Sequence, residues 1–253
     1  MEFPEPHIYL PQSFHTHTAI LFSSKTSKNQ NLASSLPNWR WVPNWRWVFP
    51  TSRDRWDTRF QEEMCAWFDA YSLTDSLRES VLHIVGILED EIRLLGGTPS
   101  HVYLGGMSQG MATALCTLSC ATGTGRIQGQ LGGFLGFCGW LPLPLGAQPK
   151  RLVSEYFLHT IFGSYNMSPG REVTSTSILS TPVCLSHGTD DAWVPVEQGR
   201  QAAQISQQIT IQVEWDEFSG AEGDGHWIKE PEGFDQIVQF VEKQCDRHQT
   251  ESQ

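Results

Sequence analysis

Gly106-Met107-Ser108-Gln109-Gly110 is the segment of the chain with the clearest potential for chemistry. The form Gly-x-Ser-x-Gly is typical of a sharp strand-to-helix turn that presents a serine hydroxyl at its apex, where it can act as a nucleophile. Glycines two positions before and two after the serine are needed because this turn leaves no room for side chains. The chain has 22 glycines in 253 residues, so the pattern alone is weak and its surroundings decide.

A serine nucleophile of this kind needs a base and an acid that orients the base, and candidates for both follow Ser108 in the chain. Residues 182–186 are apolar and predict a buried strand, and Asp190 and Asp191 come a few residues later. An acid just past the end of a strand lies at the edge where open parallel sheets place their sites. Chemistry alone does not separate these two carboxylates as the orienting acid.

Two histidines lie near these candidates. His226 follows a glycine-rich loop and precedes a helical pattern, and from such a loop an imidazole can reach back to a serine and carry its proton. His187 is interpreted instead as a histidine at the end of a strand that packs against the turn at Gly188. Ser108, one of the two acids and His226 thus form a candidate triad in the order serine, acid, histidine.

Alternating strands and helices must bring these residues together. Residues 102–104 are apolar and β-prone, and residues 111–116 are helix-prone, so strand, turn and helix are expected around Ser108. Further strands are expected at residues 19–22, 46–49, 130–137, 182–186 and 209–215, and helices at residues 60–71, 76–95 (opened by a capping box at Ser76 and Glu79) and 234–245. This alternation predicts an α/β fold with a mostly parallel central sheet and helices on both faces.

The chain resembles the phospholipase/carboxylesterase family of α/β-hydrolases, which includes acyl-protein thioesterases and small esterases, and in particular its fungal-type members. The resemblance covers the chain from about residue 15 to residue 245 and rests on residues 46–52, 61–69, 106–110, 139–142, 187–195 and 225–226. It implies the α/β-hydrolase fold, with Ser108 as nucleophile, Asp191 as orienting acid and His226 as base. It also implies that the backbone N–H of Gln109 donates to the oxyanion and that the reaction uses no metal or other cofactor.

The activity that this resemblance implies is that of a serine hydrolase which cleaves carboxylic esters or thioesters, of the acyl-protein thioesterase, carboxylesterase or lysophospholipase type. Trp140, Trp193 and Trp227 are expected near the rim of the site, where they could line a groove for an acyl chain, and core packing is the alternative. The expected partner is a small-molecule or acyl-protein substrate. The second hypothesis is a non-catalytic, hydrolase-like protein that binds an acylated ligand or partner.

The early part of the chain departs from this family pattern, because no glycine occurs before Gly86. An α/β-hydrolase takes a second oxyanion donor from a loop after an early strand, typically a glycine-rich turn. Here the strand 19–22 passes into the polar residues 23–30, and a later link near position 75 is also short. The missing first oxyanion loop is compatible with three hypotheses. The chain is an impaired enzyme that takes a donor from Ser23 or Ser24, or it is the non-catalytic protein. In the third, the gene sequence was read incorrectly and the true protein contains the loop.

Residues 37–48 are a tandem hexapeptide, in which Pro-Asn-Trp-Arg-Trp-Val occurs twice. Only the second copy runs on into Phe49, so the second copy is expected to form the strand, and Pro43 would interrupt a ladder through both copies. An insert of six residues preserves the alternation of side chains between the faces of a strand. The insert is interpreted as an extended surface loop, with a Trp/Arg patch for membrane or partner contact as the alternative.

Composition limits the other classes of function. A formal net charge of −11 without a basic run argues against nucleic-acid binding. No stretch approaches the ~18 apolar residues of a membrane span, no signal peptide is visible and the six cysteines suit reduced thiols, so a cytoplasmic protein is expected. Residues 1–253 fit a single domain, with loosely ordered tails expected at residues 1–14 and 246–253.

Overall fold

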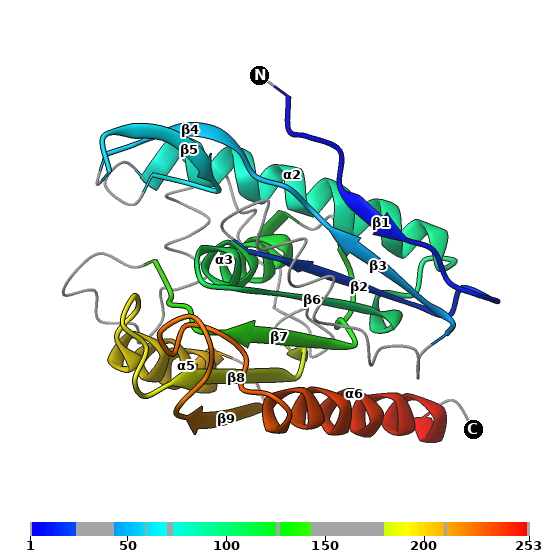
Figure 1. The fold of residues 1–253 in the computed structure, drawn as a ribbon. Helices are drawn as coiled ribbons and strands as arrows, with labels where there is room; N and C mark the ends of the chain where they lie inside the picture. Colours follow the sequence, from blue (N-terminus) through cyan, green and yellow to red (C-terminus); the bar gives the residue numbers. More distant parts are fainter. Residues whose placement is uncertain are drawn as a thin grey trace.

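The computed structural model describes residues 2–23, 43–58, 60–69, 73–124, 127–142, 180–209 and 212–251. Its centre is a seven-stranded sheet in the order β1-β3-β2-β6-β7-β8-β9 (Figure 1). The strands are β1 (His7–Tyr9), β2 (His17–Phe22), β3 (Trp45–Phe49), β6 (Val102–Met107), β7 (Gly133–Phe137), β8 (Val183–Gly188) and β9 (Val213–Phe218). Only the edge strand β1 is antiparallel to its neighbour, so the expected mostly parallel sheet is confirmed.

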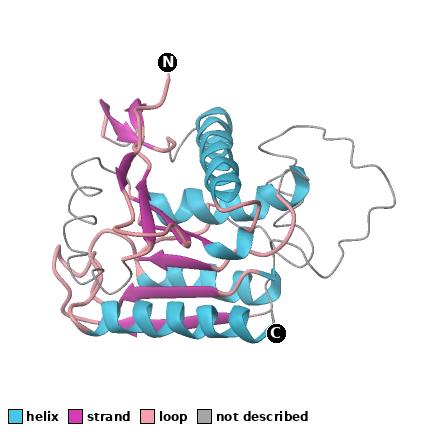
Figure 2. Ribbon diagram, turned by 90° about the vertical axis from the view of Figure 1, so that its right-hand side faces the viewer, coloured by secondary structure: helices cyan, strands magenta, loops and turns pink. Residues whose placement is uncertain are grey.

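Helices cover both faces of the sheet. The helices are α2 (Leu73–Leu94), α3 (Gln109–Thr124), α5 (Val196–Ile209) and α6 (Glu232–Glu251), with a short 3-10 turn at Pro99–His101. Alternate strand residues point to opposite faces, so Ile20 packs in one apolar layer with α2, α3 and α5, while Ala19 and Leu21 pack in a second layer with α6. In Figure 2, the strands run across the view with helices along them.

Parallel pairing gathers the carboxyl ends of β2, β6, β7, β8 and β9 at one edge of the sheet. Ser108 follows β6, and Asp191 lies three residues past the end of β8. His226 lies on the loop between β9 and α6. The fold therefore places the three candidate residues at the edge where open parallel sheets bind ligands.

The prediction of a helix at residues 60–71 is wrong, because residues 62–66 form the second strand of a hairpin. Strands β4 (Arg53–Asp57) and β5 (Glu62–Ala66) pair antiparallel, apart from the large sheet (Figure 1). Gln61 has a positive φ of 54° in the connecting turn. Arg53 and Arg55 both pair with Glu79 of α2, which attaches the hairpin to that helix. Backbone pairing across the hairpin overrides the helical spacing of a few large apolar residues.

Two expected boundaries also differ from the structure. Helix α2 begins at Leu73, so Ser76 lies inside the helix and does not cap it, and its hydroxyl accepts a hydrogen bond from the Asp69 backbone N–H at 3.2 Å. The end of α2 follows the prediction, since Gly97 N donates to Ile92 O at 2.9 Å in a glycine-terminated last turn. Helix α5 continues to Ile209, where a strand was expected, and β9 begins only at Val213.

Loosely ordered tails are expected at residues 1–14 and 246–253, and the described residues of both segments make specific contacts. Strand β1 pairs with β3 through His7 to Tyr9, and Phe3 stacks on the His83 ring at 4.1 Å between centroids. Helix α6 continues to Glu251, because neither glycine nor proline interrupts residues 246–251 and Arg247 bonds to Gln212 Oε1 at 2.5 Å. Among the described residues, Phe3, His7 to Tyr9 and Arg247 therefore tie these two segments to the body of the protein.

The second copy of the hexapeptide forms β3, as expected, and Trp45 and Trp47 are buried in the apolar layer that includes Ala19 and Leu21. The first copy, at residues 37–42, lies outside the described residues, as do Ser24 and the rest of the polar stretch after β2. Among the helices of the described ranges, none combines the length and the apolar character needed to cross a bilayer.

Candidate active site

Ser108 sits at the apex of the turn between β6 and α3, with a φ of +58° that is unusual for a residue other than glycine. The flanking glycines are required by close contacts. A Cβ on Gly106 would lie 2.4 Å from Phe22 O, and a Cβ on Gly110 would lie 2.0 Å from the same atom. The turn therefore packs directly against the end of β2, which explains the Gly-x-Ser-x-Gly spacing.

Asp191 lies beyond β8 and accepts hydrogen bonds at both carboxylate oxygens. Oδ1 accepts from the backbone N–H groups of Trp193 at 2.8 Å and Val194 at 2.9 Å. Oδ2 accepts from His226 Nδ1 at 2.7 Å. Asp190 points elsewhere, and its Oδ2 accepts from the Gly220 backbone N–H at 2.8 Å. Geometry therefore separates the two acids that chemistry left equivalent, since Asp191 alone of these two meets His226.

The surroundings of Asp191 keep its carboxyl group ionised. Burial by itself raises the pKa of this group, but hydrogen bonds from His187, His226 and the Val194 backbone N–H lower it by more. The net result is a pKa held well below the usual range of an aspartate. At neutral pH the Asp191 carboxylate is a hydrogen-bond acceptor only.

His226 is buried and is held by the glycine-rich loop before α6. Because its Nδ1 lies 2.7 Å from a carboxylate oxygen, this nitrogen carries the hydrogen and leaves a lone pair on Nε2. The loop packs on the acid segment, since Ala192 N donates to Asp224 O at 3.0 Å. Gly225 has a φ of +79°, and a Cβ there would lie 2.7 Å from the Asp190 carbonyl carbon.

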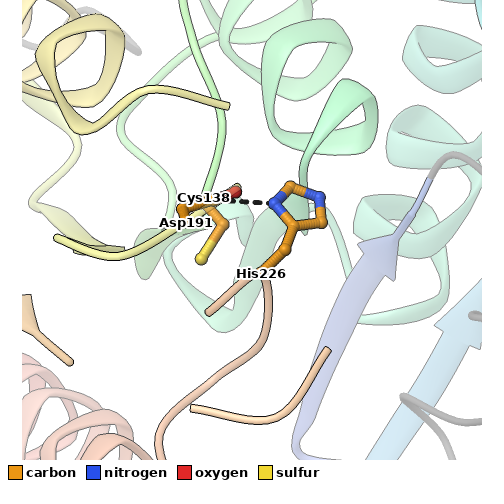
Figure 3. A group of neighbouring side chains, drawn as sticks. All are labelled: Cys138, Asp191 and His226. Carbon is orange, nitrogen blue, oxygen red and sulfur yellow. Dashed lines mark hydrogen bonds and ion pairs between the residues drawn. The ribbon is translucent and has the colours of Figure 1, made fainter. Parts of the chain in front are cut away.

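The turn that presents Ser108 meets this acid–base pair at the end of β7. Ser108 N donates to Phe137 O at 2.9 Å, and the next residue is Cys138. Ligand atoms of Cys138, Asp191 and His226 all lie within 4.8 Å of one another (Figure 3). Within the described part of the chain, the Ser108 hydroxyl makes no hydrogen bond to His226. Such contacts often tighten only when substrate is bound.

Cys138, Asp191 and His226 offer the kinds of atoms that bind zinc. However, the 2.7 Å between His226 Nδ1 and Asp191 Oδ2 is the length of a charge-assisted hydrogen bond. Two ligands of a tetrahedral zinc ion stand about 3.3 Å apart, given zinc–ligand distances of about 2.0 Å. The arrangement therefore fits an acid–base pair better than a metal site.

The side chain of Gln109 anchors the turn to a neighbouring loop. Its Oε1 accepts from the Trp67 backbone N–H at 2.8 Å, and its Nε2 donates to Phe68 O at 2.7 Å. Trp67 Nε1 in turn donates to Ser23 O at 2.7 Å, just after β2. These bonds fix the backbone of Gln109, whose N–H is the expected oxyanion donor. The sequence gives no signal of this anchoring role, because the spacing of Trp67 and Phe68 predicts a helix.

The three tryptophans expected near the rim have different surroundings. Trp140 is half-buried and packs edge-on against Phe68 at 6.3 Å between ring centroids. Trp193 is 58% exposed beside Asp191. Trp227 is buried in the apolar layer with α6, which was the alternative interpretation, and its carbonyl accepts from Cys138 Sγ at 3.6 Å. Trp140 and Trp193 thus remain the better candidates for contact with substrate.

His187 contacts the candidate acid, and does not only pack against the turn at Gly188 as the sequence predicts. It is fully buried, and its Nε2 lies 3.3 Å from Asp191 Oδ2 and 2.9 Å from Val194 O. The packing interpretation therefore missed a contact with the candidate acid. The spacing His-Gly-x-x-Asp, which puts both side chains in one turn after a strand, was the signal that could have revealed it.

Known proteins resemble this chain along most of its length. The sequence profile of the family described as Phospholipase/Carboxylesterase matches residues 5–167. Acyl-protein thioesterase 1 of Gibberella zeae is 25% identical over 261 residues, which cover 94% of this chain and 95% of the relative. Carboxylesterase SOBER1 of Arabidopsis thaliana is 26% identical over 178 residues, which cover 67% of this chain and 64% of the relative.

Solved structures give the same result for the fold. Zea mays acyl-protein thioesterase 2 superposes with a TM-score of 0.66 at 22% identity, covering 96% of this chain and 99% of that chain. Esterase PE8 superposes with a TM-score of 0.67 at 19% identity, covering 94% and 98%. The chain therefore has the expected α/β-hydrolase fold, belongs to the phospholipase/carboxylesterase family and is a serine hydrolase of that family.

Proposed function

We propose that this chain cleaves carboxylic esters or thioesters through a triad of Ser108, His226 and Asp191. The observation that supports it most directly is the 2.7 Å hydrogen bond from His226 Nδ1 to Asp191 Oδ2, at the same edge of the sheet as the strained turn of Ser108. An imidazole held by a carboxylate through Nδ1 has the tautomer that accepts a proton at Nε2. The pairing also explains why Asp191, and not Asp190, takes the role of orienting acid.

The reaction follows from these roles. His226 Nε2 takes the hydroxyl proton of Ser108 while Oγ attacks the substrate carbonyl carbon, whose C=O electron pair moves onto the oxygen. The oxyanion collapses to the acyl-serine, and the leaving alcohol or thiol receives the proton from His226. Water then repeats the sequence, releases the carboxylic acid and restores Ser108. Asp191 remains ionised throughout and stabilises the imidazolium, in keeping with its low pKa.

The backbone N–H of Gln109 is the proposed oxyanion donor. Gln109 is the first residue of α3, and the first N–H groups of a helix have no acceptor within the helix. The two bonds of its side chain to Trp67 and Phe68 hold this residue in place. Helix α3 also directs the positive end of its dipole toward the developing negative charge.

A second oxyanion donor remains a prediction from the sequence. Ser23 lies against the turn, since a Cβ on Gly110 would be 2.9 Å from Ser23 Cα, and Ser24 falls outside the described residues. Loss of one such donor lowers turnover by ~10²–10³, whereas loss of a nucleophile or base costs on the order of 10⁶. We therefore expect a slow enzyme rather than an inert one if a second donor is lacking.

The proposed substrate is an acyl ester or acyl thioester. The names of the similar proteins include an acyl-protein thioesterase and a carboxylesterase, and these chemistries share the acyl-serine intermediate. Trp140 and Phe68 form an apolar pair beside the segment that follows β7, which suits an acyl chain. We also place the reaction in the cytoplasm, because all six cysteines lie in the described ranges and none is in a disulfide.

A fluorophosphonate probe tests the nucleophile directly. The recombinant protein should gain the mass of one phosphonyl adduct in an intact-mass spectrum, and Ser108→Ala should gain none. Ser119→Ala, which changes another buried serine outside the turn, should still react. Absence of a Ser108-dependent adduct from folded protein would favour the non-catalytic hypothesis. Hydrolysis of p-nitrophenyl esters and S-acyl thioesters of increasing length then ranks the substrates.

A further inference from the structure

His187 donates one hydrogen to two acceptors. Its Nε2 lies 2.9 Å from Val194 O and 3.3 Å from Asp191 Oδ2, and both oxygens accept only. On the other side of the ring, Nδ1 is buried without a hydrogen-bond partner among the described residues. A hydrogen on Nδ1 would have no acceptor there, so the ring hydrogen belongs on Nε2. The N–H is shared between the carbonyl and the carboxylate.

With this bond, every lone pair of the Asp191 carboxylate has a donor. Oδ1 receives the backbone N–H groups of Trp193 and Val194, and Oδ2 receives His226 Nδ1 and His187 Nε2. A carboxylate with four donors cannot rotate about its Cβ–Cγ bond without losing several of them. The donor set therefore fixes the direction of the lone pair that meets His226.

We propose that His187 is a positioning residue for the hydrolytic reaction, which holds Asp191 in the orientation that meets His226. This inference rests on the proposed function of the triad and extends it by one residue. His187 does not contact the reacting atoms, and it acts through the carboxylate alone. Its second bond, to Val194 O, ties the carboxylate to the turn of residues 188–194.

Helix α5 leaves space for the His187 ring only because residue 199 is glycine. A Cβ on Gly199 would lie 2.3 Å from His187 Nδ1 and 2.9 Å from Trp215 Cη2. The ring therefore packs tightly against α5 on the side away from Asp191. A methyl group at residue 199 would displace the ring without changing any of its chemistry.

Of the described charged groups near the two histidines, Asp191 is the one that bonds directly to His226. Glu217 pairs with His187 across β8 and β9, but it is bound by Arg200 of α5 at 2.7 Å, and hydrogen bonds from Arg200 and then Trp215 lower its pKa to about 2. Asp190 is engaged by the Gly220 backbone N–H. Among the described residues, the thiol of Cys138 is a further titratable group beside His226.

Three variants test the proposal. His187→Phe removes the N–H and keeps a ring, His187→Gln restores an N–H donor, and Gly199→Ala displaces the ring while His187 remains. Gly86→Ala in α2 is the matched control for the last variant, because within the described residues nothing lies within 4 Å of a Cβ there. Far-ultraviolet circular dichroism and thermal melts establish that each variant is folded.

His187→Phe and Gly199→Ala should lower kcat by about tenfold at unchanged KM, the magnitude of one lost hydrogen bond to a charged group. The acid limb of the pH profile of kcat/KM should move to higher pH. A carboxylate with fewer donors presents more negative charge to His226 and favours its protonated form. His187→Gln should recover both properties in large part, and Gly86→Ala should match the parent protein.

Nuclear magnetic resonance of the ring N–H protons gives a readout that does not depend on activity. The parent protein should show slowly exchanging ring protons from both His187 and His226, and the His226 signal should shift in His187→Phe and Gly199→Ala. A bond to Val194 O alone would hold the turn and leave that signal unmoved. Folded variants with an unchanged His226 signal and acid limb would overturn the proposal. A shifted signal in a protein that no fluorophosphonate labels would uphold the positioning role and reject the hydrolase function.

Discussion

At the scale of single residues, the two adjacent acids provide a matched comparison. Asp191 accepts from His226, whereas Asp190 accepts from the Gly220 backbone N–H. Asp191→Asn should lower kcat by about 10⁴, because an amide donor toward His226 favours the wrong tautomer of the imidazole. Asp190→Asn should keep most of the activity. Rates of ester hydrolysis or of fluorophosphonate labelling measure both, and equal losses in the two variants would refute the assignment of Asp191.

The low pKa of Asp191 leads to a second prediction, which concerns the stability of the protein. A carboxyl group whose pKa is lower in the folded than in the unfolded state stabilises the fold above its unfolded value of about 3.9, and this contribution declines as pH falls toward the folded value. The parent protein should therefore exceed Asp191→Asn in free energy of unfolding at pH 7, and the difference should shrink below about pH 4. Urea denaturation at pH 7 and pH 3 measures it. A difference independent of pH would contradict the prediction.

At the scale of elements, the turn between β6 and α3 depends on its contact with β2. Gly110→Ala should lower the free energy of unfolding by about 3 kcal/mol, because its Cβ would overlap the backbone of Phe22. Gly86→Ala should raise it by about 0.5–1 kcal/mol, since alanine is the better helix former and the site is open among the described residues. Chemical denaturation of both variants measures the contrast.

The informative result is that the two substitutions change the free energy of unfolding in opposite directions, although both replace a helical glycine by alanine. If Gly110→Ala were neutral, the turn would not be packed against β2 as described. A folded Gly110→Ala protein should also label more slowly at Ser108, because the displaced turn moves the hydroxyl and the backbone N–H of Gln109 together.

The local spacing of apolar residues predicts those helices and strands that are formed by a single long or strongly apolar segment. The helical spacing of Leu77, Val81, Ile84 and Leu88 identifies α2, and these side chains are buried along one face. The hairpin of β4 and β5 could not be predicted in this way. Its strands are short and charged, and its pairs such as Arg55 with Met64 exist only once the two segments meet.

Sequence motifs predict which residues form the candidate site, but they do not predict the contacts between those residues. The Gly-x-Ser-x-Gly motif indicates Ser108, the order serine, acid, histidine indicates His226, and the family resemblance indicates Asp191. The anchoring of Gln109 by Trp67 and Phe68 joins separate elements, whereas the contact of His187 with Asp191 lies within the single segment His-Gly-x-x-Asp. No spacing within one segment encodes the anchoring of Gln109, so that contact requires the fold.

At the scale of the whole molecule, the first residues of the chain connect with the site through a series of packed groups. Phe3 stacks on His83 at 4.1 Å and faces Trp67 at 6.2 Å between ring centroids, and the guanidinium groups of Arg53 and Arg55 lie over its ring. Trp67 in turn bonds to Gln109 through its backbone. Phe3 therefore supports the loop that holds the proposed oxyanion donor.

Phe3→Ala should consequently lower the free energy of unfolding by about 2 kcal/mol, less than the 3–5 kcal/mol of a fully buried phenylalanine because its ring is only half-buried. Phe14→Ala is the matched control, since that ring is 84% exposed and its loss should cost less than about 0.5 kcal/mol. Phe3→Ala should also slow labelling of Ser108, because a loosened Trp67 holds Gln109 less firmly. Equal stability of the two variants would show that the amino-terminal segment is not part of the packed structure, and a stability loss with unchanged labelling would show that the support ends at Trp67.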